Sequence, residues 1–201
     1  MNHIQKKKLI MDNITLYLPS SIKITDDQFF EMCQINELIK FERNADASLL
    51  LKPLLGGITS NINAGLTGEL ANWNDDKSQG VVFGSDVGFI LQNGAIYSPS
   101  AVWIKLELWN NLTDEEQQKF PPLCPDFVIE LLSSSDSLKT TQEKMKEYID
   151  NGVRLGILIN RKSRQVEIYR PGKEVEVLDS PDTVSGEDVL KGFVLHLGMI
   201  W

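Results

Sequence analysis

The sequence has little of the material that builds zinc sites or histidine-based catalytic centres. Its 201 residues include two cysteines, Cys33 and Cys124, and two histidines, His3 and His196, which lie near opposite ends of the chain. A tetrahedral zinc site needs several such ligands together, and a catalytic triad needs a histidine beside its nucleophile. The composition therefore disfavours both chemistries. We expect the two cysteines to be buried free thiols in a reducing cytoplasm.

Long apolar runs and an excess of basic charge are also missing. No run of 18 apolar residues occurs, so the sequence predicts no transmembrane helix and no membrane partner. The start "MNHIQKKKLIMDNITLYLP" lacks the apolar core and cleavage site of a signal peptide, which favours a cytoplasmic protein. The net charge of −8 argues against binding nucleic acid through overall charge. A DNA-binding role therefore requires a local basic surface or a dimer groove.

What is present fits one globular domain. With 42% hydrophobic residues, the chain is long enough to bury a sizeable core. We predict an N-terminal tail over 1–15 and a single domain over 16–201. The predicted order is helix, strand pair, helix, strand hairpin, short polar helix, strand, helix, strand and strand, which is typical of a mixed α/β domain around one sheet.

The segments that carry this order have recognisable boundaries. Thr25 is the expected cap of a helix over 26–36, and Ser60 or Asn61 of a second helix. In that second helix Gly65 and Gly68 each cost about 1 kcal/mol relative to Ala, which suggests close packing or an absent side chain. The strand pair is "LIKFER" with "ASLLLKPLL", and the last helix begins at Ser135 or Ser137 and ends at Gly152.

Glu130 is the strongest candidate for a catalytic or metal-binding residue. It stands in "FVIELL", where each neighbour is apolar, and a carboxylate in such a strand is rarely buried without a partner or a metal. Asp126 shares its strand face but lies about 13 Å away at roughly 3.3 Å per residue. The two cannot ligate one ion, so we expect the partner of Glu130 on a neighbouring strand.

The hairpin "GSDVGFILQNGAIYSPSAVWI", residues 84–104, can provide that partner. One arm carries Asp86 and the other carries Ser100. If the turn is a three-residue loop over 92–94, Asp86 lies opposite Ser100 and shares its face. If the turn is a two-residue Asn-Gly loop, Asp86 points to the other face.

These stretches together resemble a known family. The order of elements is similar to the PD-(D/E)XK nuclease fold, and "PPLCPDFVIELLSSSDSLKTTQEKMKEYIDNGVRLGILIN" resembles the Uma-type restriction endonuclease family most specifically. Matches in "DDQFFEMCQINELIKFERNADA", "NINAGLTGELANWN", "GFILQNGAIYSPSAVWI" and "VEIYRPGKEVEVLD" extend the likeness over nearly the whole chain after about residue 15. The resemblance implies a restriction endonuclease-like core of helix, hairpin, strand, helix and strand, with an N-terminal helix and strands added.

The resemblance also implies a site. It makes Glu130 a metal-binding catalytic carboxylate, with the backbone carbonyl of Leu131 as a further ligand of Mg²⁺ or Mn²⁺. Leu132 stands where the classical lysine of this fold would be, and Lys144 in the next helix is the expected replacement. The implied partner is DNA, and the implied assembly is a homodimer.

One position departs from the family pattern. The family reads "SPD" where this chain reads "SPS", so Ser100 replaces the first metal-binding aspartate. A hydroxyl brings no negative charge, which predicts an impaired site unless Asp86 compensates. We therefore consider a Mg²⁺-dependent DNA endonuclease with an impaired site, and an inactive nuclease-fold module that binds DNA or protein. An acidic protein-interaction domain with no nucleic-acid role is the third hypothesis.

Overall fold

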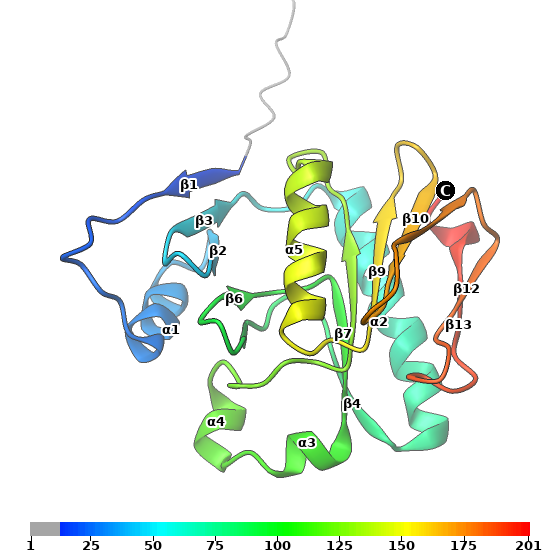
Figure 1. Ribbon diagram of the computed structural model, residues 1–201, viewed down its shortest axis with the longest axis horizontal. Helices are drawn as coiled ribbons and strands as arrows, with labels where there is room; N and C mark the ends of the chain where they lie inside the picture. The colour runs from blue at the N-terminus through cyan, green and yellow to red at the C-terminus, as the bar shows by residue number, and fades with distance from the viewer. Residues whose placement is uncertain (1–12) are drawn as a thin grey trace, which may run out of the picture.

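A mixed six-stranded sheet forms the centre of the molecule. The computed structural model describes residues 13–201 (Figure 1). The strands of this sheet run in the order β11-β10-β9-β8-β7-β4, and the β8–β9 pair is parallel while the other pairs are antiparallel. Their bounds are β4 Gly80–Phe83, β7 Ala101–Lys105, β8 Phe127–Leu131, β9 Leu155–Asn160, β10 Gln165–Tyr169 and β11 Glu176–Asp179.

Two smaller sheets complete the strand content of the described residues. An antiparallel five-stranded sheet has the order β1-β3-β2-β6-β5, and β12 pairs with β13 near the C-terminus. The bounds are β1 Ile14–Leu16, β2 Lys40–Arg43, β3 Leu49–Lys52, β5 Phe89–Ile90, β6 Ile96–Tyr97, β12 Thr183–Ser185 and β13 Val194–His196. Strand β1 lies across the position predicted as the end of the N-terminal tail, and residues 1–12 of that tail lie outside the described residues.

Two long helices cover opposite faces of the six-stranded sheet (Figure 1). Ile62, Leu66 and Leu70 of α2 pack with the C-terminal segment on one face, and Met145 and Tyr148 of α5 pack on the other. The helices are α1 Asp26–Ile35, α2 Gly57–Lys77, α3 Leu106–Asn110, α4 Asp114–Gln118, α5 Leu138–Asp150 and the 3-10 helix η1 Leu197–Met199. No helix among the described residues is both long and apolar enough to span a membrane.

Most element boundaries follow the local sequence signals. Thr25 caps α1 in a capping box with Gln28, and Ser137 caps α5. The predicted cap of α2 at Ser60 or Asn61 is wrong. Gly56 is the N-cap, and the Ser60 amide already donates to its carbonyl at 3.0 Å, so Ser60 lies inside the first turn.

The predicted hairpin over 84–104 is divided between two sheets. Around the turn, Leu91 N–H donates to the Ala95 carbonyl at 2.8 Å, which is the three-residue loop. Here Phe89 pairs with Tyr97, but β4 and β7 pair with a register shifted by one residue, as the Phe83–Val102 pair shows. Residues 84–88 and 98–100 form no strand, and over these two segments the chain passes from one sheet to the other.

The glycines of α2 do not share one role. A Cβ at Gly65 would lie 3.2 Å from the Met199 sulfur, which confirms close packing there. A Cβ at Gly68 would meet nothing within 4 Å, so the predicted close packing is wrong at that residue. The tightest contact lies elsewhere: a Cβ at Gly80 would stand 2.3 Å from the Trp103 ring and 2.4 Å from the Ile104 carbonyl oxygen.

We therefore predict opposite outcomes for two Gly→Ala substitutions. Gly80→Ala should lower the free energy of unfolding by about 1–3 kcal/mol, because the new methyl group overlaps a buried indole and the backbone. Gly68→Ala should leave stability unchanged or raise it by up to about 1 kcal/mol through helix propensity. Urea denaturation of both variants measures the difference, and equal effects would contradict the packing described for Gly80.

Candidate active site

Glu130 lies on the β8 face that α5 covers. Alternation along β8 places Phe127, Ile129 and Leu131 in the core under α2, so Val128 and Glu130 face the opposite side. The Glu130 side chain is therefore buried, as the sequence predicts, and it needs polar partners there.

Lys144 is the main partner of Glu130. Its Nζ lies 2.7 Å from Glu130 Oε1, and the Tyr148 hydroxyl, one helical turn further along α5, donates to the same oxygen at 3.1 Å. The ammonium also lies 4.8 Å from the centre of the Tyr97 ring and 5.5 Å from that of Tyr148. The structure thus brings together the two residues, Glu130 and Lys144, that the sequence selects.

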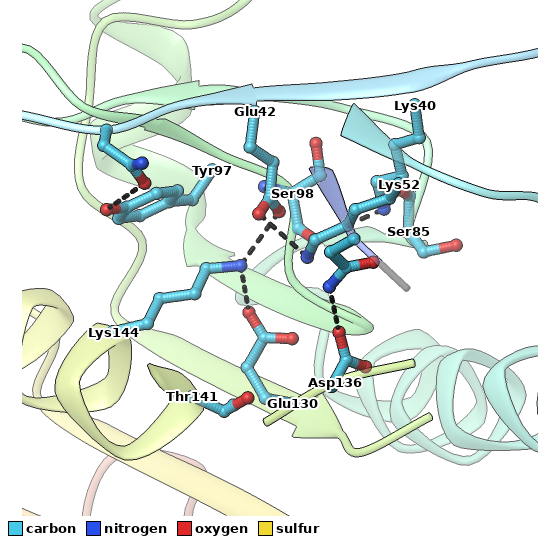
Figure 2. Close-up of polar contacts among 12 residues, drawn as sticks. Lys40, Glu42, Lys52, Ser85, Tyr97, Ser98, Glu130, Asp136, Thr141 and Lys144 are labelled. Carbon is cyan, nitrogen blue, oxygen red and sulfur yellow. Dashed lines mark hydrogen bonds and ion pairs between the residues drawn. The ribbon is translucent and has the colours of Figure 1, made fainter. Parts of the chain in front are cut away.

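Glu42 is a second buried carboxylate, and sequence reasoning missed it. It points from β2 toward Lys144 (Figure 2). Its Oε1 atom lies 2.8 Å from Lys144 Nζ and accepts the Ser98 N–H at 3.0 Å. Its Oε2 atom lies 2.8 Å from Lys52 Nζ, in an ion pair that does not have hydrogen-bond geometry. Lys144 consequently bridges two carboxylates with its single ammonium group.

Burial and charge act in opposite directions on this cluster. The exposed fractions are 0% for Glu42, 6% for Glu130 and 9% for Lys144, so each charge is strongly desolvated. Burial raises the pKa of Glu42, but Lys144, Lys52 and Lys40 outweigh it and hold that pKa well below its usual value. Burial lowers the pKa of Lys144, and the two glutamates outweigh it and raise the pKa. Both groups are therefore charged at neutral pH.

Lys40 adds a third ammonium group at the edge of the cluster. Its Nζ donates to the backbone carbonyls of Ser85 and, at 3.3 Å, Ser98. Burial lowers the pKa of Lys40 to about 8, with Glu42 and Glu130 opposing the shift and Lys52 and Lys144 adding to it. Lys40 and Lys52 are direct cross-strand partners, an unfavourable pairing of like charges in isolation. Glu42, which exerts a Coulomb attraction on both lysines, relieves that repulsion.

Ser100 lies beside Glu130, but its hydroxyl group already has a hydrogen-bond partner in the backbone. The register of β7 with β8 pairs Ala101 with Ile129, which places the preceding residue, Ser100, opposite Glu130. Its backbone N–H donates to the Ile129 carbonyl at 2.9 Å, and its Oγ accepts the Leu131 N–H at 3.0 Å. An aspartate here would lie next to Glu130, whereas the serine stabilises the strand end.

Asp86 does not occupy the ladder position that its compensating role requires. It is exposed in the turn where the chain passes between the two sheets. Together with Lys40 and Ser98 it lines a groove of about 950 Å³ that opens beside the cluster. Asn63 of α2 also lines this groove, and its buried Oδ1 has no hydrogen-bond partner among residues 13–201. The metal-ligand role of Asp86 stays a prediction.

The fold is similar to that of a solved structure. A solved structure titled "Crystal structure of a putative nuclease belonging to DUF820 from Anabaena variabilis ATCC 29413" matches with a TM-score of 0.70 at 23% identity. The match covers 88% of this chain and 96% of that one, which confirms the predicted restriction endonuclease-like architecture. No functionally curated protein matches the chain.

The chain belongs to the Uma2 family, described as "Putative restriction endonuclease", whose model matches residues 26–198. This confirms the family that the sequence resembles. Such a family implies a divalent cation, yet the residues present fit one poorly. Among residues 13–201 no group of three or more Asp, Glu, His or Cys side chains is placed to hold a metal. Glu42 and Glu130 are paired with lysines, and the Ser100 hydroxyl binds the backbone.

We predict that Glu42→Gln lowers the free energy of unfolding by about 3–5 kcal/mol at pH 7, because it leaves buried lysines without their main counter-charge. The pKa of Glu42 is lowered by folding, so its stabilisation is present above the unfolded value near 4.5 and is lost below it. The difference from the parent should therefore narrow as the pH falls below about 4.5 in urea titrations.

Glu107→Gln is the matched control, because Glu107 pairs with Lys105 on the surface. It should produce no measurable change in unfolding at either pH. Equal effects of the two variants would contradict the buried ion-pair cluster.

Proposed function

We propose that this protein acts on DNA as a restriction-endonuclease-type phosphodiesterase whose hydrolysis is impaired at Ser100. The observation that carries the proposal is the convergence of Glu130, Glu42 and Lys144 on contacts of 2.7–2.8 Å beside an open groove. Carboxylates next to a lysine are the groups that phosphodiester hydrolysis needs to activate water and to neutralise charge on the phosphate. Membership of the family supports DNA as the substrate class.

The impairment follows from the charge that Ser100 lacks. Hydrolysis of a phosphodiester needs a water of lowered pKa, and in such centres a divalent ion held by carboxylates lowers it. Glu130 and Glu42 are the carboxylates that would hold Mg²⁺ or Mn²⁺ here, and both are occupied by lysines. Lys40 is the lysine of the cluster that lines the groove and could contact a phosphate there, so recognition of the backbone is expected to survive better than cleavage.

The groove beside the cluster is the proposed route for DNA. Lys40 and Ser98 line the groove, and the Ser98 N–H donates to Glu42 Oε1, so the groove adjoins the buried centre at Ser98. The unpartnered Asn63 oxygen provides an acceptor for a donor group on the substrate. Lys40 is the basic residue of the groove lining, which also carries the carboxylates of Glu37 and Asp86.

We further propose a homodimer. Ile39, Leu54 and Leu55 line one side of the groove while 41%, 70% and 42% exposed, and a second copy of the chain would cover such apolar surface. Sedimentation velocity should show a dimer for the parent and a larger monomer fraction for Leu54→Asp. A monomeric parent at tens of micromolar would contradict this assembly.

Ser100→Asp should raise cleavage. We expect Mn²⁺-dependent nicking of supercoiled DNA by Ser100→Asp to exceed that of the parent at least about tenfold, because the aspartate restores a ligand beside Glu130. Adding Glu130→Gln to this variant should abolish the gain. A parent that cleaves as fast as Ser100→Asp, with Glu130→Gln inactive, would show that the centre is not impaired.

A second candidate is an inactive nuclease-fold module that binds DNA or protein, and the pairing of both carboxylates with lysines favours it. Retention of DNA without cleavage by both the parent and Ser100→Asp would support this function. Absence of DNA binding at low salt, where phosphate contacts are strongest, would favour a protein partner instead.

A further inference from the structure

The candidate site contains several positively charged lysine side chains. Three ammonium groups, those of Lys40, Lys52 and Lys144, act on the Glu42 carboxylate. Glu130 is the second carboxylate of the centre, and its Oε1 atom lies 2.7 Å from Lys144 Nζ. A centre built to hold a divalent cation has an excess of carboxylates, whereas here lysines outnumber the glutamates.

A third carboxylate balances the cluster without becoming available to a metal. Asp136 follows β8 in the sequence. Burial raises the pKa of Asp136, but the positive charge of Lys52 helps to hold that pKa below its usual value. Asp136 accepts hydrogen bonds from Ser133 N–H at 2.9 Å and from Asn13 Nδ2 at 2.9 Å. Three lysines and three carboxylates therefore give the cluster a formal charge of zero.

Lys52 is the decisive residue of this balance. It reaches Glu42 from β3, and the Glu42 side chain is completely buried, so the ion pair is shielded from solvent. Lys144 occupies the other Glu42 oxygen and Glu130 at the same time. A cation entering the centre would meet the repulsion of these two ammonium groups before it reached a free pair of carboxylate oxygens.

We propose that Lys52, with Lys144, takes the place of a divalent metal ion in this chain, so that the centre folds in its charged form without Mg²⁺ or Mn²⁺ and does not bind them. Ser100 completes this conversion, since its hydroxyl accepts the Leu131 N–H and adds no negative charge. The inference deepens the proposed function at the same site and explains its impairment. It concerns cation binding alone, so it can be tested without DNA.

The test is Mn²⁺ titration by calorimetry, with thermal unfolding in the presence and absence of Mn²⁺ as a second readout. The parent is expected to give no binding heat at the centre and no change in melting temperature. Ser100→Asp with Lys52→Met removes one positive charge and adds one negative charge, and it should bind Mn²⁺ at least about tenfold more tightly than Ser100→Asp alone.

Ser100→Asp with Lys105→Met is the matched control, because Lys105 is an exposed lysine outside the cluster and the net charge changes equally. It should bind Mn²⁺ no better than Ser100→Asp alone. If Lys52→Met prevents folding, Lys52→Gln replaces it, since glutamine has a polar amide that can face Glu42 without carrying a charge.

Two results would overturn the proposal. One is that the parent binds Mn²⁺ and the Glu130→Gln variant does not. The other is a folded Ser100→Asp, Lys52→Met or Ser100→Asp, Lys52→Gln variant that binds Mn²⁺ no better than the Lys105 control. Because no nucleic acid is present, a failure of DNA binding or cleavage would count against the proposed function and leave these measurements unaffected.

Discussion

The buried ammonium group of Lys144, held between Glu130 and Glu42, is the interaction on which the candidate site depends. It joins α5 to β8 of the six-stranded sheet and to β2 of the five-stranded sheet. Two carboxylates brought this close in an apolar interior repel one another strongly, and a single bridging cation converts the repulsion into attraction. The relative position of the two sheets at the site is therefore an electrostatic requirement as well as a packing one.

The charges within the site nearly cancel, although the chain as a whole is acidic. Its net charge is −8, but the lysines of the site converge from β2, β3 and α5, elements far apart in the sequence. The carboxylates that face them belong mostly to the interior, and Lys40 lies at the edge of the groove. The three lysines and three carboxylates of the cluster cancel, so the local charge at the site differs from the net charge of the whole protein.

Sequence reasoning predicted the parts of the site that have local signals. Glu130 was visible as a carboxylate in an apolar strand, and Lys144 as a helix residue one turn before Tyr148. Ser100 was visible as a departure from a family motif. Glu42 and Lys52 were missed because "LIKFER" and "ASLLLKPLL" read as an ordinary strand pair. A signal was present in the facing lysines Lys40 and Lys52, an unfavourable pair that requires a nearby carboxylate, but it depends on a strand register the sequence does not fix.

The hairpin shows the same limit. The sequence left a turn of two or of three residues open, and the change of sheet after Phe83, which depends on packing between distant segments, removed Asp86 from its ladder position although the turn has three residues. The proposed centre is neutralised by lysines rather than by a metal ion. Anomalous diffraction from crystals of the parent protein soaked in MnCl₂ tests it most directly. We predict no manganese peak within about 2.5 Å of a Glu130 or Glu42 oxygen. A peak bonded to either carboxylate, with Lys144 displaced, would contradict the account.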